Sequence, residues 1–208
     1  DLYYIGNFES NAEKIISTAR KAKENGADLV VFSELSVCGY CPDDLLYRTD
    51  FIDGCNASVE KIIAECADIP IIIGAPLSNV SGKGKQLFNA ALFIANGDVK
   101  SQSKTVLPDE GVVDEHRYFE PSDKFDLINL NGVKIALTVG GDVVDYPMDM
   151  LAKLNPDFIV NISAVAYAHD DNHLSDLSQV AKKYGLPLLN VNQVGANTNL
   201  DRDRKSVV

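Results

Sequence analysis

The chain has 208 residues, of which 46% are hydrophobic and 24% charged, an ordinary composition for a globular protein with a buried core. Its net charge of −11 and its pI near 4.6 create a field that repels nucleic acid and anionic membranes, so we exclude both as main partners. No apolar run reaches the roughly 18 residues of a membrane span, and no signal peptide precedes the first predicted helix, so a soluble cytoplasmic protein is expected.

The first third of the chain predicts two helices with a buried strand between them. Ser10-Asn11-Ala12-Glu13 has the form of a capping box, and apolar residues at helical spacing follow it, with Gly26 just past the end. Residues 27–34, ADLVVFSE, are an apolar run typical of a strand buried on both faces. A second helix is expected over residues 51–67.

The rest of the chain predicts strands, two of the connections being tight turns. Residues 69–77 read as another buried strand, and hairpins are expected around Asn96-Gly97 and Asn131-Gly132, because Asn-Gly favours two-residue turns. Further strands are expected in the PDFIVNISA and LPLLNVNQ segments, with a helix from about residue 170 to 184 between them. This order of strands and helices predicts one α/β domain with mixed sheets over residues 1–208.

Cys38 and Cys41 form a C-x-x-C pair, a spacing that often carries thiol–disulfide chemistry. The residue before the pair is Val37, where a thioredoxin-type site has an aromatic residue, and the chain is about twice the usual size for that fold. Together with Cys55 and Cys66, the cysteines are too few and too unevenly spaced for a secreted disulfide scaffold. We therefore expect reduced, passive thiols.

Three segments carry a resemblance to a known family. Residues 26–48, GADLVVFSELSVCGYCPDDLLYR, resemble the first signature of the nitrilase (carbon–nitrogen hydrolase) superfamily, and more closely that of the glutaminase domain of glutamine-dependent NAD synthetases. Residues 103–125, SKTVLPDEGVVDEHRYFEPSDKF, are similar to the second signature, and residues 134–145, KIALTVGGDVVD, stand where the third should be. In this pattern Cys38 falls at a variable position and Cys41 replaces a proline. The resemblance implies a nitrilase-like α-β-β-α sandwich with mixed sheets.

The chemistry implied by the resemblance is amide hydrolysis through a thioester. A carboxylate takes the proton of a cysteine thiol, the thiolate attacks glutamine or a small amide, and a lysine with a backbone N–H holds the oxyanion. Carried across, Glu34 is the general base, Lys104 is the family lysine and Glu115 supports it. In the full enzymes the released ammonia passes to a synthetase domain, which uses ATP and Mg to amidate nicotinate adenine dinucleotide. That domain is not found in this sequence, so no cofactor is expected in residues 1–208.

The chain departs from the family pattern at the positions that act on substrate. Gly140 stands where the family has its nucleophilic cysteine, and glycine has no side chain with which to attack. Among the substrate-binding positions, Glu110 replaces a tyrosine, Val165 replaces a serine, and Tyr118 belongs to the Arg-Tyr-Phe block. Two hypotheses remain open: a glutaminase domain that has been inactivated, and a nitrilase-fold scaffold or binding module that is not an enzyme.

Three smaller expectations complete the sequence reading. His169 and His173 are four residues apart, a spacing used by two-His metal sites, but no third ligand motif accompanies them and we expect no metal. A homo-oligomer is expected. Compared with the family, the domain looks truncated at both ends, lacking the first strand and the last strands.

Overall fold

The computed structural model describes residues 2–109, 113–165, 173–197 and 200–202. The sequence condenses into four α-helices and three 3₁₀ turns within these ranges. They are α1 (Phe8–Glu24), η1 (Asp43–Tyr47), α2 (Thr49–Glu65), η2 (Glu115–Arg117), η3 (Gly140–Val144), α3 (Tyr146–Ala152) and α4 (His173–Tyr184). None of the described helices is both long enough and apolar enough to cross a membrane.

The strands form two four-stranded sheets and a small two-stranded pair. One sheet has the order β1-β2-β3-β4, the other has the order β5-β6-β7-β8, and each contains both parallel and antiparallel neighbours. The mixed sheets predicted from the sequence are therefore confirmed. The strands are β1 (Val30–Val31), β2 (Ile71–Ser78), β3 (Leu87–Ala95), β4 (Asp98–Ser103), β5 (Ile128–Leu130), β6 (Val133–Val139), β7 (Phe158–Ser163), β8 (Leu188–Asn192), β9 (Gly195–Asn197) and β10 (Leu200–Arg202).

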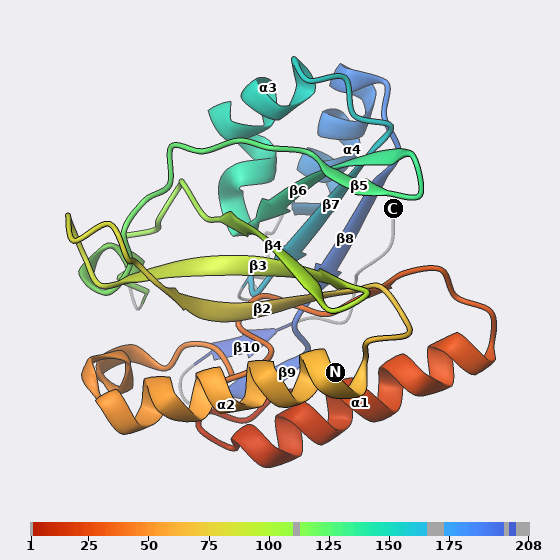
Figure 1. The fold of residues 1–208 in the computed structure, drawn as a ribbon. Helices are drawn as coiled ribbons and strands as arrows, with labels where there is room; N and C mark the ends of the chain where they lie inside the picture. The colour runs from red at the N-terminus through yellow and green to blue at the C-terminus, as the bar shows by residue number, and fades with distance from the viewer. Residues whose placement is uncertain (1, 110–112, 166–172, 198–199, 203–208) are drawn as a thin grey trace.

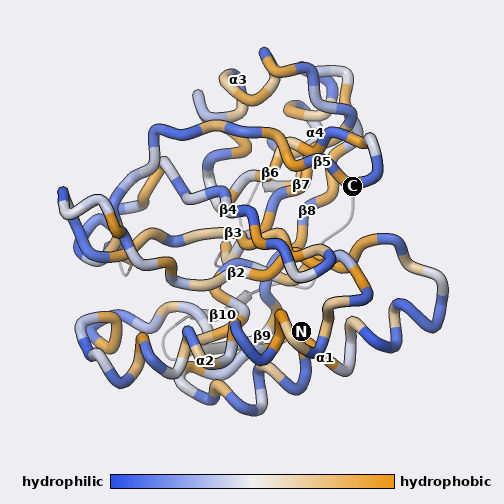
Figure 2. Tube along the Cα trace, viewed as in Figure 1, coloured by the Kyte–Doolittle hydropathy of each residue, from blue (hydrophilic) through white to orange (hydrophobic). Residues whose placement is uncertain are grey.

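The elements stack in four layers (Figure 1). Helices α1 and α2 cover one sheet, α3 and α4 cover the other, and the two sheets face each other in the middle. Hydrophobic residues gather along the strands, while the helices alternate between apolar and hydrophilic stretches (Figure 2). The core between the sheets is built from β-branched and aromatic side chains that interdigitate, including Ile72, Phe93 and Ile162. The predicted α-β-β-α sandwich is confirmed.

Both predicted hairpins are present. Asn96 and Gly97 have φ of +53° and +81°, and Asn131 and Gly132 have φ of +51° and +89°, the left-handed conformation that two-residue hairpin turns require. They join β3 to β4 and β5 to β6. The turns are correct because Asn and Gly tolerate this backbone better than any other pair.

Two local predictions differ from the structure. The capping box at Ser10 is wrong: the N-cap is Asn7, whose side chain accepts a hydrogen bond from the Ser10 N–H at 3.4 Å, so the helix begins one turn earlier. The strand expected over residues 27–34 is reduced to Val30–Val31, because the chain turns away from the sheet after Phe32 and places Glu34 beyond its edge. The predicted start of α4 lies outside the described residues.

Candidate active site

A cavity of about 360 Å³ lies at the edge where strands of both sheets end. Lys104 directly follows β4, Gly140 directly follows β6 and Ala164 directly follows β7. The carboxyl ends of neighbouring parallel strands meet at one edge of a sheet, which is the usual place for a binding site in α/β proteins. The described residues that line the cavity are Glu34, Tyr40, Lys104, Val106, Pro108, Val113, Gly140, Gly141, Ala164 and Val165.

A buried cluster of charges lies on one side of this cavity. The Lys104 ammonium donates to Glu34 Oε1 at 2.8 Å and to Glu115 Oε1 at 2.9 Å. The Asn89 amide donates to the same two carboxylates, at 2.7 Å to Glu34 and 3.2 Å to Glu115. All four side chains are buried. The sequence prediction that Glu34, Lys104 and Glu115 belong to one site therefore agrees with their placement in the structure.

The electrostatics of the cluster favour bound protons. Burial raises the pKa of Glu34, and the Lys104 charge only partly opposes this shift. Burial works to lower the pKa of Lys104, but the carboxylates of Glu115 and Glu34 outweigh it and the pKa is raised. Both shifts follow from packing two carboxylates around one ammonium away from water. Lys104 thus remains a cation, and Glu34 is a carboxylate with a raised affinity for a proton, which is what a general base needs.

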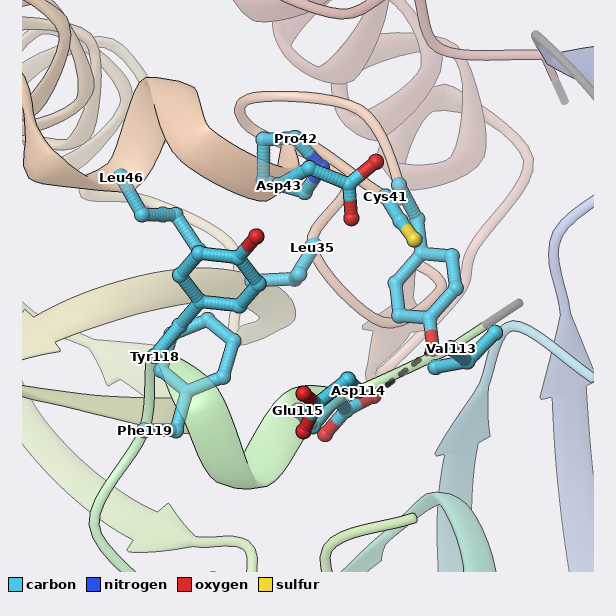
Figure 3. A pocket seen from close by; sticks show the side chains of 11 residues that line it. Leu35, Cys41, Pro42, Asp43, Leu46, Val113, Asp114, Glu115, Tyr118 and Phe119 are labelled. Carbon is cyan, nitrogen blue, oxygen red and sulfur yellow. Dashed lines mark hydrogen bonds between the residues drawn. The ribbon is translucent and has the colours of Figure 1, made fainter. Parts of the chain in front are cut away.

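Tyr40 extends the cluster on the side of Glu115. Its hydroxyl donates to Glu115 Oε1 at 2.8 Å, and Figure 3 marks with a dashed line a hydrogen bond that reaches Glu115 beside Val113. Burial, followed by the negative charge of Glu115, raises the pKa of Tyr40 well above its ordinary value. The phenol therefore stays protonated and fixes the Glu115 carboxylate against Lys104.

Residue 140 faces this cluster. Gly140 has φ of +59°, and a Cβ built on its backbone would lie 2.7 Å from both the Cε and the Nζ of Lys104 and 3.5 Å from Glu34 Oε2. A side chain at this position would thus point directly between the lysine and the glutamate. Because residue 140 is glycine, the end of the Lys104 side chain occupies that space. The residues that would activate a nucleophile are assembled, but residue 140 supplies no nucleophilic atom.

Gly74, on β2, allows Glu34 to reach the site. A Cβ at Gly74 would lie 2.2 Å from the backbone nitrogen of Leu35 and 2.7 Å from the carbonyl carbon of Glu34. Real Cβ atoms do not approach backbone this closely, so the turn that carries Glu34 packs on β2 only because residue 74 is glycine. The Gly74 N–H also donates to the Ser36 hydroxyl at 3.2 Å, which holds the turn in place.

Asp142 ties the turn at residue 140 to the segment after the lysine. Its buried carboxylate accepts hydrogen bonds from the N–H of Thr105, at 3.0 and 3.1 Å, and from the N–H of Val106, at 2.7 Å. Burial raises the pKa of Asp142 to about 7, although the backbone donors and the Lys104 charge oppose the shift. Asp142 therefore sets the distance between residue 140 and Lys104.

The structure places only some of the predicted substrate-binding residues at this cavity. Val165 lines the cavity, held by Asn192, whose Oδ1 accepts from the Val165 N–H at 2.9 Å and whose Nδ2 donates to the Val165 carbonyl at 3.2 Å. Tyr118 does not line this cavity, and its hydroxyl donates to Asp44 at 2.8 Å. Glu110 lies outside the described residues.

The thiols show no sign of redox chemistry. Cys38 is fully buried, and burial raises the pKa of its thiol well above the ordinary value, the opposite of what a reactive cysteine needs. Cys41 is half-buried, and none of the four cysteines, all of which the structure describes, forms a disulfide bond. His169, the first member of the predicted histidine pair, falls outside the described residues. Among the residues that the structure describes, no cluster of histidine, cysteine and carboxylate groups suits a metal ion.

Three site residues went unrecognised at the sequence level: Tyr40, Asn89 and Asp142. Each carried a signal. Asn89 is a polar residue inside the apolar run of β3, Tyr40 follows the glycine of the first signature, and Asp142 comes two residues after the nucleophile position. A buried polar side chain needs partners, so a polar residue within a core strand points to an internal network.

Comparison with known proteins agrees with this geometry. The sequence pattern of the family described as Carbon-nitrogen hydrolase matches residues 3–206. The chain belongs to this family. A TM-score of 0.89 relates the structure to a glutamine-dependent NAD⁺ synthetase from Acinetobacter baumannii, with 32% sequence identity over 99% of this chain and 39% of that one. An amidase mutant of the nitrilase superfamily from Nesterenkonia shares the fold, with a TM-score of 0.85 and 22% identity over 99% of this chain and 78% of that one.

The curated relatives of the chain include glutamine-dependent NAD(+) synthetases. A glutamine-dependent NAD(+) synthetase from Synechocystis is 33% identical over 94% of this chain, and one from Acinetobacter baylyi is 29% identical over 99% of it. The chain spans 38% of the length of each of these relatives. It is thus homologous to the glutaminase domain of such enzymes.

Proposed function

We propose that this chain is a glutaminase domain of the NAD synthetase type that has lost amide hydrolysis. In such a domain, glutamine would be cleaved to supply ammonia for the amidation of nicotinate adenine dinucleotide. The general base Glu34, the lysine Lys104 and the supporting Glu115 are retained in one buried cluster. The group that would form the thioester is absent, so the covalent route ends before its first bond is made.

The observation that carries the proposal is the environment of Gly140. The direction of a Cβ at this position, toward Lys104 and Glu34 Oε2, is that required of a nucleophile with a base and a cation beside it. A side chain at a position unrelated to catalysis would have no reason to meet both groups. This supports descent from a hydrolase and, with glycine in place, loss of its reaction.

The test is ammonia release from glutamine and from a small amide such as propionamide. We expect no release above buffer, because losing the nucleophile of a hydrolase costs on the order of 10⁶ in rate. Intact-mass measurement after incubation should likewise show no acyl adduct. Turnover that disappears in Glu34→Gln would overturn the proposal, since it would require a nucleophile elsewhere in the cavity.

A second candidate function is a scaffold with no ligand in this cavity. The observation that favours it is that the buried charges already have partners within the protein. Lys104 bridges the carboxylates of Glu34 and Glu115, and Asn89 and Tyr40 donate further hydrogen bonds to these carboxylates, as in a structural ion cluster. Titration of glutamine and propionamide, followed by the backbone amide signals of Gly141 and Val165, separates the two. Saturable shifts indicate a retained amide-binding site, and their absence favours the scaffold.

A further inference from the structure

A second cavity, of about 400 Å³, is lined in part by Tyr118. It shares no lining residue with the cavity at Gly140. Its volume falls within the range of sites that hold small molecules, roughly 300 to 1,000 Å³. The residues that line it are Leu46, Tyr47, Lys85, Gln86, Leu87, Arg117 and Tyr118.

The cavity has an apolar floor and aromatic walls. Leu46 and Leu87 are buried beneath it. The rings of Tyr47 and Tyr118 lie with centroids 5.3 Å apart and planes tilted by 54°. Tyr47 is 63% exposed, so a large part of its ring is available to a ligand. Such surfaces accept a planar ring, because offset or tilted stacking adds to the area that the ring buries.

One cation of the cavity is held in place by its neighbours. The Arg117 guanidinium lies 5.5 Å from the centroid of the Tyr118 ring. Asp44 contacts both groups: its Oδ1 lies 3.3 Å from Arg117 Nη2 and accepts from the Tyr118 hydroxyl at 2.8 Å. A guanidinium has five N–H donors, so this contact leaves donors for a ligand.

The other cation, Lys85, comes from the loop between β2 and β3. The loop is fixed beside the cavity because the Lys85 N–H donates to the Glu120 carboxylate at 2.8 Å. Its ammonium forms no ion pair with any carboxylate that the structure describes. The chain has 30 acidic residues and 19 lysines and arginines, yet two of the seven lining residues are cations and none is acidic. Because Asp44 pairs with Arg117 beside the cavity, Lys85 is the lining cation whose charge is left for a ligand.

From this combination we propose that the cavity binds a small planar aromatic anion. The ring packs against Tyr47 and Tyr118 above the leucine floor, and a carboxylate or phosphate faces Lys85 and Arg117. The two anionic groups share the chemistry that the site recognises, namely an oxyanion accepting charge-assisted hydrogen bonds. This binding uses no residue of the Gly140 cavity and stands independently of the proposed function.

Four probes test the proposal by NMR titration of the full chain at low ionic strength. Benzoate and phenyl phosphate carry both the ring and the charge, benzyl alcohol lacks the charge, and cyclohexanecarboxylate lacks the flat ring. We expect saturable shifts at the amides of Tyr47, Lys85, Leu87 and Tyr118 with at least one aromatic anion, and at least about tenfold weaker binding of the alcohol. The stronger of benzoate and phenyl phosphate identifies the oxyanion that the site prefers.

Matched variants locate the charge effect. Lys85→Gln should weaken binding of the preferred anion roughly three- to tenfold. Lys83→Gln is the control, because Lys83 lies in the same loop, is exposed and lines a different cavity. Tyr47→Ala should weaken binding of the aromatic anion and leave binding of cyclohexanecarboxylate nearly unchanged. Circular dichroism verifies that this variant is folded. Equal binding of the alcohol, equal effects of Lys83→Gln and Lys85→Gln, or no saturation below about 10 mM would each overturn the proposal.

Discussion

Restoring a thiol at residue 140 provides the sharpest test of the site geometry. In Gly140→Cys, the new Cβ would start 2.7 Å from the Lys104 ammonium and 3.5 Å from Glu34 Oε2. The atoms it meets are the far end of a flexible side chain, so Lys104 can move by a few tenths of an ångström or more while keeping its two carboxylate partners. The φ of +59° costs a non-glycine residue about 1–2 kcal/mol. The variant should therefore fold, with a Tm lower by about 2–8 °C for a chain of this size.

The reactivity of the new thiol follows from its nearest charge. The Lys104 ammonium would lie 2.7 Å from the new Cβ and Glu34 Oε2 would lie 3.5 Å from it. Because the ammonium is the nearer charge and burial raises the pKa of Glu34, we expect a thiol pKa below the ordinary value of about 8.5. If the thiol pKa falls by about one unit, the thiolate fraction at pH 7 rises about eightfold. A thiolate of lower pKa is intrinsically less nucleophilic, which reduces this gain by a factor of about three. The net gain in alkylation rate is about two- to threefold. Cys38, Cys55 and Cys66 are buried, so residue 140 should also be alkylated faster than these three native thiols.

The assay is the pH dependence of iodoacetamide labelling, read residue by residue by mass spectrometry. Gly141→Cys is the matched control, because its Cβ would lie in the same cavity with only Val106 Cγ1 nearby, at 3.9 Å. We expect a midpoint below 8.5 for residue 140 that moves above it when Lys104→Met is added, and a midpoint near 8.5 for residue 141. Equal midpoints at both residues, with no response to Lys104→Met, would refute the reasoning. Glutamine turnover should stay low even with the thiol present.

Three further predictions concern stability, each measured by chemical denaturation. Lys104→Met leaves two buried carboxylates without their cation and should cost about 3–5 kcal/mol. Lys100→Met, exposed on the strand that precedes Lys104, should change stability by no more than about 0.5 kcal/mol. Equal losses would mean that the cluster is not electrostatically coupled. Gly74→Ala should cost more than about 3 kcal/mol through its backbone clash, and Gly141→Ala less than about 1 kcal/mol, so a tolerated Gly74→Ala would contradict the close packing of the Glu34 turn. Asp142 has a pKa of about 7 in the folded protein, above its value in the unfolded chain. As pH rises from about 4 to 7, the unfolded chain loses this proton first, so the contribution of Asp142 to stability is lost over that range. Asp142→Asn should flatten this part of the pH–stability curve, and an unchanged slope would contradict the prediction.

The local features of this fold could be predicted from sequence because they depend on neighbouring residues alone. The turns at Asn96-Gly97 and Asn131-Gly132 follow from the backbone conformations that these residues tolerate. Apolar runs marked the strands on both sides of the inter-sheet core. The start of α1 was misjudged because Asn7 and Ser10 are both good capping residues. Asn11 is buried and donates to the carbonyls of Tyr4 and Val37. These tertiary contacts, which the local sequence does not report, hold Asn11 inside the helix.

The residue types of the site could also be predicted from the sequence, through the family signatures around Glu34, Lys104 and residue 140. Their mutual arrangement was not, because Glu34 and Lys104 are 70 residues apart and meet only when both sheets are formed. The participation of Asn89 likewise depends on β3 lying between the strands that carry the two charges. Sequence patterns report conformational preferences over a few residues, whereas a buried ion cluster is decided by which strand ends the packed sheets bring together. The sequence by itself therefore determined that residue 140 has no nucleophile, and only the tertiary structure decided that the Lys104 ammonium occupies its place.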